Sequence, residues 1–470
     1  MVSGIEERVN PRAKTGTPSP RHGGPWQTTY RRLTIGLLLT MGGVAFESLA
    51  VATVMPATAA DLGGLSLYGW AFSAFLLTNL VGIVVAGGES DRRGPAQPLM
   101  VGVSLFAIGL VVGGLAPSMA VLIAGRSLQG FGGGVIGSVA YVAVGRGYPE
   151  TFRPRMLALL STAWVVPGLV GPAVAGLIAD SVGWRWVFLG LAPMIVASAL
   201  LALPSLRRIP SGDATGRDTG RIRGAIRLAV GSALFLSGLG RHELSLALPL
   251  VIVGAAVALP ALRRLLPAGT MAAARGLPAA VAVMGLLNMA FFGVDAFIPL
   301  GLVEIRGRSV AFAGLVLTGA TITWTIGSWL QARFSDTASR RALVRSGLGL
   351  VALGSAGAAA VVVALLPASV GPAVWAIAGL GMGLAFSTIS LVVLEMAPVG
   401  GEGRAASSLQ LANVLGGGIG TGIGGAAIAA LGATAASLRH AIVGQDVAMM
   451  IVACGAIFIA GRIPKESSHR

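Results

Sequence analysis

Long apolar runs, separated by short polar connectors, dominate the chain. A run of roughly 18–25 apolar residues is long enough to cross a bilayer as a helix. Such runs begin near residues 33, 67, 98, 119, 156, 185, 225, 246, 277, 311, 346, 371, 405 and 441. The pattern therefore predicts fourteen transmembrane helices. The pair over 225–262 is the least regular, because each half is short and "RHELS" is its only polar break.

A weak internal repeat divides these runs into two sets of six. The connector after the second run reads "GGESDRRGPA" (87–96), and the equivalent connector of the second set reads "ARFSDTASRR" (332–341). Repeats of this kind are typical of transporters that move two bundles around a central site. We therefore expect an all-α polytopic membrane protein with two six-helix bundles and two extra helices. The expected segments are a disordered tail (1–32), a bundle (33–205), a basic linker with the extra helices (206–276), a bundle (277–462) and a tail (463–470).

Composition and charge placement agree with a membrane protein. The chain has 470 residues, of which 54% are hydrophobic and 11% charged, and this balance excludes an ordinary soluble enzyme. The net charge of +16 lies mainly in the connectors, which favours topology signals over nucleic-acid binding. With the N-terminus inside, the opposite side holds few basic residues. They are Arg185, Arg241, Arg306, Arg308 and Arg439. Both termini are therefore expected in the cytoplasm, on a multi-pass protein of the cell membrane.

Several classes of function lack the residues they need. The single cysteine, Cys454, excludes a disulfide framework, and the four histidines lie in expected loops or tails, so no metal site is predicted. A membrane enzyme would need acids and histidines gathered at one face, and a receptor would need more than the longest loop, 206–224. A channel would need a filter or a charged ring. A transporter remains.

Ionisable side chains within the runs are the candidate functional groups, because charge at membrane depth is costly. Glu47 lies in "MGGVAFESLAVATVMP" (41–56) and Asp295 in "MAFFGVDAFIPL" (289–300). Asp295 is either a second proton or cation site or an acid near the outer mouth. Glu395 is expected to pair with Arg404 or another loop arginine.

Arg126 is the basic residue within an apolar run, and Gln129 shares its helix face three residues later. A guanidinium keeps its charge, so at this depth it needs an anion or water. Arg126 either faces the bundle interior, with Glu47 as a plausible partner, or snorkels to the outer surface.

Four stretches match patterns of a known family. "GGESDRRGPA" matches a loop motif at Gly87, Asp91, Arg92 and Gly94, and "LIAGRSLQGFGGG" (122–134) matches a fourth-helix pattern. "WVVPGLVGPAVAG" (164–176) matches an antiporter motif at Gly171, Pro172 and Gly176, and "FESLAVATVMP" places Glu47 on the acid of a first-helix pattern. The chain resembles the fourteen-helix drug:proton antiporter branch of the major facilitator superfamily over nearly all of residues 33–462.

The resemblance implies a proton-coupled exporter of hydrophobic or cationic small molecules that works by alternating access. Export of a lipid or an endogenous natural product by the same fold is the alternative. The expected partners are such a substrate, protons and the lipid bilayer, without nucleic acid, for a monomer powered by the proton gradient and without a cofactor. Glu47 and Arg126 would couple protons, and Asp295, which corresponds to Glu47 by the internal repeat, is the candidate for a second coupling site.

The resemblance also assigns a gate and a hinge. The gate would comprise Gly87, Asp91, Arg92, Gly94, Asp336, Arg340 and Arg341, and the hinge Gly171, Pro172 and Gly176. Polar and aromatic side chains within the runs are candidates for a substrate cavity, although each also suits helix packing. They are Gln129, Asn79, Trp164, Asn288, Trp324, Gln410 and Asn413.

Overall fold

The computed structural model describes residues 24–211, 219–241, 243–334, 338–397, 402–431 and 434–464. Within these ranges the chain is helical, and fourteen spans are long and apolar enough to cross a membrane. The prediction of an all-α protein with fourteen transmembrane helices is confirmed.

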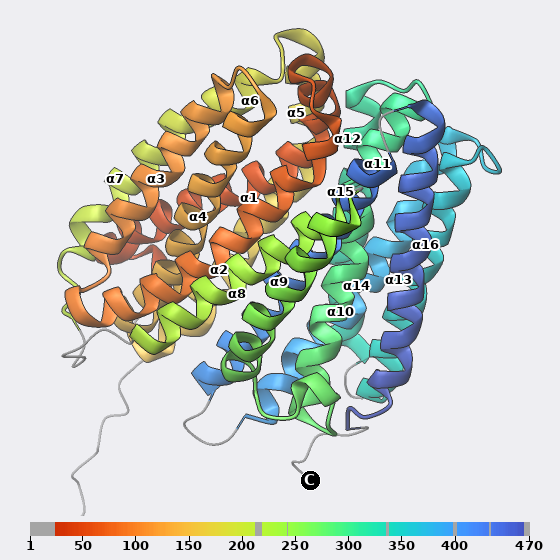
Figure 1. The fold of residues 1–470 in the computed structure, drawn as a ribbon. Helices are drawn as coiled ribbons and strands as arrows, with labels where there is room; N and C mark the ends of the chain where they lie inside the picture. The colour runs from red at the N-terminus through yellow and green to blue at the C-terminus, as the bar shows by residue number, and fades with distance from the viewer. Residues whose placement is uncertain are drawn as a thin grey trace, which may run out of the picture.

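The helices form two bundles with a pair of helices between them, as Figure 1 shows by the colour change from red to blue. The first bundle contains α1 (Thr28–Leu62), α2 (Tyr68–Arg93), α3 (Ala96–Gly114), α4 (Met119–Gly147), α5 (Arg153–Ser181), α6 (Arg185–Leu189) and α7 (Leu191–Leu206). The second contains α10 (Leu277–Asp295), α11 (Ile298–Leu300), a π-helical turn (Gly301–Ile305), α12 (Val310–Phe334), α13 (Arg340–Val362), α14 (Gly371–Glu395), α15 (Glu402–Leu431) and α16 (Ala435–Ala460). Between them in sequence lie α8 (Thr219–Leu239) and α9 (Leu244–Leu265).

Successive spans run in opposite directions, which gives the molecule two ends. We call the end where α1 begins and α16 finishes the terminal side; it lies at the bottom of Figure 1, near the marked C-terminus. The opposite end, with the connections after Leu62, Gly114 and Ser181, is the far side. Two spans are interrupted: α6 continues into α7, and α10 continues through α11 into the π-helical turn.

Several helices begin before their apolar runs do. Helix α1 starts at Thr28, inside the segment expected to be a disordered tail, and the hydroxyl of Thr34 donates to the carbonyl of Pro25 at 2.8 Å. The predicted tail is therefore wrong for residues 24–32. Helix α8 likewise starts inside the expected linker, at Thr219. Polar first turns lie beyond the hydrocarbon core, so hydropathy locates the core of a span rather than its ends.

Close backbone contacts join the two bundles on the far side. A Cβ added to Gly69 of α2 would lie 2.3 Å from the Cα of Gly425 on α15. A Cβ added to Gly176 of α5 would lie 2.7 Å from the Cα of Ala311 on α12. Only glycine permits such an approach, so these positions fix how closely the bundles meet.

Helix α8 packs along the seam between the bundles. Its Ala225, Leu228 and Ala229 belong to one buried apolar cluster with Leu77 and Leu80 of α2 and Leu411, Val414 and Leu415 of α15. Helix α9 packs on α8 through the close pair Gly231 and Gly254, and leaves side chains such as Leu244 and Ile252 exposed. Helix α8 therefore connects the inserted pair to both bundles.

Candidate functional site

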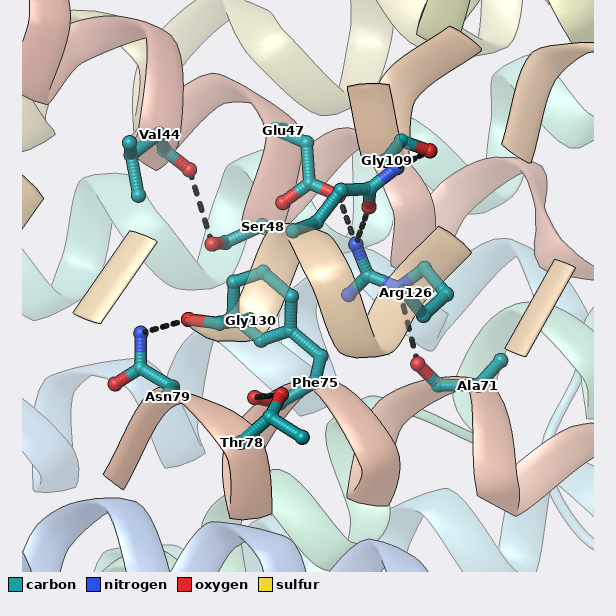
Figure 2. A network of polar contacts seen from close by, with 11 residues as sticks. Val44, Glu47, Ser48, Ala71, Phe75, Thr78, Asn79, Gly109, Arg126 and Gly130 are labelled. Atoms are coloured by element: carbon teal, nitrogen blue, oxygen red, sulfur yellow. Dashed lines mark hydrogen bonds and ion pairs between the residues drawn. The ribbon is translucent and has the colours of Figure 1, made fainter. Parts of the chain in front are cut away.

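Glu47 and Arg126 form an ion pair inside the first bundle. Glu47 comes from the middle of α1 and Arg126 from the second turn of α4, and each side chain is only 2% exposed. Figure 2 shows the carboxylate and the guanidinium pointing toward each other. The two opposite charges lie together in the buried interior of the bundle, where loss of either partner would leave the other charge uncompensated and destabilise the fold. Arg126 thus faces the bundle interior and does not snorkel to the outer surface.

Contacts from further helices orient the Arg126 guanidinium. Its Nε donates to the carbonyl of Ala71 at 3.0 Å, and the Nη1 that meets Glu47 also donates to Gln129 Oε1 at 2.6 Å. Gln129 in turn donates to the carbonyl of Gly109 at 2.8 Å, and the guanidinium lies 4.2 Å from the centre of the Phe75 ring. The cation is therefore held by α1, α2 and α4, with α3 supporting it through Gln129.

The second carboxylate oxygen of Glu47 is different. Oε2 is buried and has no hydrogen-bond partner in the described part of the chain. An unpartnered buried oxygen on a charged group is costly, and a proton is the smallest ligand that could satisfy it. The geometry thus leaves one position at Glu47 open to protonation while Arg126 occupies the other.

Asp295 occupies the corresponding place in the second bundle. It ends α10, and the indole Nε1 of Trp375 on α14 donates to its carboxylate at 2.8 Å. The Trp375 ring stacks on Phe291 with centroids 5.0 Å apart. The hydroxyl of Tyr68, from the first bundle, donates to the carbonyl of the next residue, Ala296, at 3.1 Å. Asp295 therefore lies beside the contact between the bundles.

The expected gate residues lie on the terminal side, where they form contacts within each bundle. Asp91 at the end of α2 pairs with Arg146 at the end of α4, and Arg92 pairs with Glu89 at 2.7 Å. Gly94 has φ +77°, a left-handed conformation that favours glycine. Gly87 has room for a side chain, because the nearest atom to an added Cβ is 4.0 Å away.

In the second bundle, Arg340 at the start of α13 pairs with Glu395 at the end of α14. This identifies the loop arginine that partners Glu395. Arg341 donates to the carbonyl of Ile463 at 2.8 Å, which ties α13 to the end of α16. Asp336 lies outside the described residues.

The expected hinge residues belong to one continuous helix, α5, which runs through Pro167 and Pro172. The carbonyl oxygen of Pro172 would lie 2.4 Å from a Cβ added to Gly314 of α12. Gly176 also faces α12, whereas Gly171 faces the Phe46 ring of α1, 3.4 Å from an added Cβ. Pro172 and Gly176 thus lie at the contact between the bundles, and Gly171 at a contact within the first.

The expected cavity residues lie on several helices of both bundles. Neither described cavity, one of about 280 Å³ beside Arg93 and Arg207 and one of about 20 Å³ in the second bundle, includes any of them. Most make packing contacts: Gln129 binds Arg126, Asn79 donates to Gly130, Asn288 donates to Met284 of its own helix, and Trp324 packs against Phe291 and Phe386. Trp164 and Gln410 are exposed, and Asn413 is half-buried.

Sequence reasoning missed Asp446, which is 2% exposed on α16. Asp446 lies inside the apolar run that begins near residue 441, so the criterion that selected Glu47 and Asp295 would also have selected it. It also missed Trp375, for which an apolar run gives no signal, because an indole in such a run reads as ordinary packing.

Comparison with known proteins assigns the family. The family model described as "Major Facilitator Superfamily" matches residues 33–421, most of the chain. The chain belongs to the major facilitator superfamily. This membership confirms the family resemblance seen in the sequence. Both the superfamily and the fold are those of transporter proteins rather than of enzymes.

Individual members of the superfamily are similar over most of their length. A probable multidrug-efflux transporter of Mycobacterium tuberculosis is 26% identical over 427 residues, covering 86% of this chain and 90% of that protein. The multidrug transporter protein MdtP of Bacillus subtilis is 27% identical over 408 residues, covering 83% and 74%. Among solved structures, a bacterial homologue of the human lysosomal transporter Spinster, in an inward-facing and unoccupied conformation, has a TM-score of 0.67 at 16% identity and covers 93% of this chain and 98% of its own.

Proposed function

We propose that this chain is a proton-coupled exporter of hydrophobic small molecules, acting as a monomer in the cell membrane with both termini in the cytoplasm. The names of its superfamily relatives support drug efflux as the activity. The observation that carries the proposal is the buried pair of Glu47 and Arg126, with Glu47 Oε2 left without a partner. The excess of basic residues in the terminal-side connectors supports the orientation.

The pair supplies a switch between two arrangements of α1 and α4. When a proton binds Glu47 Oε2, the carboxyl becomes neutral and its Coulomb attraction to Arg126 is lost. Arg126 keeps its charge and its bonds to Gln129 and the carbonyl of Ala71. Protonation therefore weakens the direct link between α1 and α4 while leaving α4 attached to α2.

A hydrophobic substrate that carries a positive charge competes with the proton for the Glu47 carboxylate. Substrate and proton then bind in alternation, and proton movement down its gradient drives substrate export. Each charge that crosses the membrane contributes ~2.3 kcal/mol per 100 mV, enough to sustain uphill transport.

Alternating access requires that the bundles seal one side at a time. The close contacts Gly69–Gly425 and Gly176–Ala311 support an arrangement in which the far side is the closed one. With cytoplasmic termini, this is the state closed to the outside. The ion pairs Asp91–Arg146 and Arg340–Glu395 hold the terminal-side helix ends in each bundle, where they set the shape of the cytoplasmic gate.

The test uses purified protein in proteoliposomes, with uptake of a fluorescent hydrophobic cation driven by an imposed pH gradient. We expect uptake that a protonophore abolishes and that Glu47→Gln reduces at least tenfold. Glu243→Gln makes the same chemical change at an exposed loop acid and should transport normally. Proton-dependent uptake retained in Glu47→Gln would overturn the proposed role of this pair.

A further inference from the structure

A second buried acid lines a small cavity, and the proposed transport cycle does not use this acid. Asp446 of α16 is 2% exposed and lines a cavity of about 20 Å³ in the second bundle. No side chain or backbone group in the described part of the chain donates a hydrogen bond to its carboxyl. The other cavity residues are apolar or aromatic, among them Leu302, Val316 and Trp375. A polar group at such a position needs a ligand, because an unpaired buried carboxylate is strongly disfavoured.

We propose that Asp446 is a proton-binding site of the second bundle, whose occupancy changes during transport. This inference rests on the proposed proton coupling and adds a second carboxyl to it. The cavity volume admits about one water molecule and no organic substrate. Mg²⁺ and Ca²⁺ need about six or more oxygen ligands and Zn²⁺ needs about four ligands, whereas this cavity offers one carboxyl group among apolar side chains. A proton is the ligand that fits both the volume and the lining.

No cation described on the neighbouring helices is placed to compensate a negative charge on the Asp446 carboxyl in place of that proton. Helix α16 packs against α10, α13 and α15 and the π-helical turn. The first and last of these carry acids, Asp295 and the exposed Glu304, and neither carries a cation. Between Ala405 and Leu431, α15 carries no ionisable residue.

The cations of α13 lie at its terminal end and have other partners. Arg340 pairs with Glu395, Arg341 bonds the carbonyl of Ile463, and Arg345 bonds the carbonyl of Ile457. On α16 itself, Arg439 and His440 are exposed near the far end. A neutral, protonated carboxyl is therefore the form of Asp446 that this surrounding favours.

Trp375 connects Asp446 to the acid already described. Its ring lines the cavity that Asp446 faces, and its indole N–H binds Asp295. A movement of this one side chain would alter the surroundings of both acids together. The two carboxyls are thus placed to load and release protons in a linked way, with Trp375 as a positioning residue between them.

Infrared spectroscopy of the purified, full-length protein tests protonation directly. A protonated carboxyl has a carbonyl stretch that an ionised one lacks, and we expect this band in the resting protein to weaken in Asp446→Asn. Glu243→Gln should leave the band unchanged. Should Asp446→Asn fold poorly, aspartate labelled with ¹³C at the side-chain carboxyl, in an Asp295→Asn background, must shift the band instead. A band unaffected by both changes overturns the proposal.

Transport then tests the role of the site. In proteoliposomes, Asp446→Asn should lower the number of protons released per substrate by about one while retaining substrate exchange without a gradient. An unchanged ratio would overturn the transport role even if the infrared band is lost. A wild-type protein that moves no protons would instead overturn the proposed function, while the infrared result would still decide whether Asp446 holds a proton.

Discussion

The indole N–H of Trp375 donates a 2.8 Å hydrogen bond to the carboxylate of Asp295, which joins α14 to α10. These are the fourth and first spans of the second bundle, and Arg126 and Glu47 join the same two spans of the first. Each bundle thus ties its first-span acid to its fourth span, through a charge in one and a neutral donor in the other. Loss of the partner should therefore cost more in the first bundle than in the second.

Arg126→Leu leaves Glu47 buried without its cation. Removal of one partner of a buried ion pair typically costs about 3–5 kcal/mol, because the remaining charge is uncompensated. We expect a large fall in the melting temperature of the detergent-solubilised protein, measured by circular dichroism. Adding Glu47→Gln to the same chain removes the stranded charge and should recover part of the loss. A double variant no more stable than Arg126→Leu would contradict the pairing.

Trp375→Phe removes the donor to Asp295 but keeps a ring that can stack on Phe291. The expected cost is about 1–3 kcal/mol, the penalty for a buried acceptor left unsatisfied. Trp324→Phe is the matched control, because Trp324 packs against the same Phe291 ring and no hydrogen bond of its indole is described. Thermal unfolding of the two variants measures the difference. Equal losses would show that ring packing, not the hydrogen bond, matters at position 375.

Hydropathy was sufficient to predict the number of spans, because each span must supply its own apolar length. It placed the starts of α8 and α13 several residues late, since polar turns such as the one that begins at Arg340 continue the helix beyond the hydrocarbon core. The packing of α8 along the seam could not be predicted. Leu228 and Leu80 look like any lipid-facing leucines until the tertiary contacts are known.

The charged residues of the site could be predicted because charged residues are rare within transmembrane spans. Glu47 and Arg126 stood out because each is an ionisable residue in a long apolar run, and a buried charge requires a partner. The expected cavity was less predictable, because residues such as Asn288 also donate hydrogen bonds within their own helix. The type of a residue and its position within an apolar run identify a buried charge. They do not distinguish an amide side chain that lines a substrate cavity from one that packs against a neighbouring helix.

Gly69→Val should loosen the far side. Its Cβ would lie 2.3 Å from backbone at Gly425, so the bundles must separate there. The neighbouring contact, in which Ser73 donates to the carbonyl of Gly418 at 3.0 Å, supplies a reporter. In a Cys454→Ala background, we expect the Ser73→Cys thiol to react several-fold faster with a water-soluble maleimide when Gly69→Val is present.

Gly88→Ala is the control for that experiment, because an added Cβ at Gly88, also on α2, meets nothing within 4 Å. It should leave the reaction rate of the Ser73→Cys thiol unchanged. A Gly69→Val variant that reacts as slowly as this control would show that the Gly69–Gly425 contact does not keep the far side closed.

The two terminal-side ion pairs should respond differently to neutralisation. The side chains of Asp91 and Arg146 are 46% and 33% exposed, whereas those of Glu395 and Arg340 are 25% and 14% exposed. Exposed pairs contribute about 0–1 kcal/mol and are screened by salt, so Asp91→Asn should lower the melting temperature only slightly, and less at high salt. Glu395→Gln leaves Arg340 partly buried without its anion, and its larger loss should persist in salt. Melting curves of both variants at low and high sodium chloride measure this difference. Equal, salt-sensitive losses would mean that the Arg340–Glu395 pair is as solvated as the other and holds α13 to α14 no more firmly.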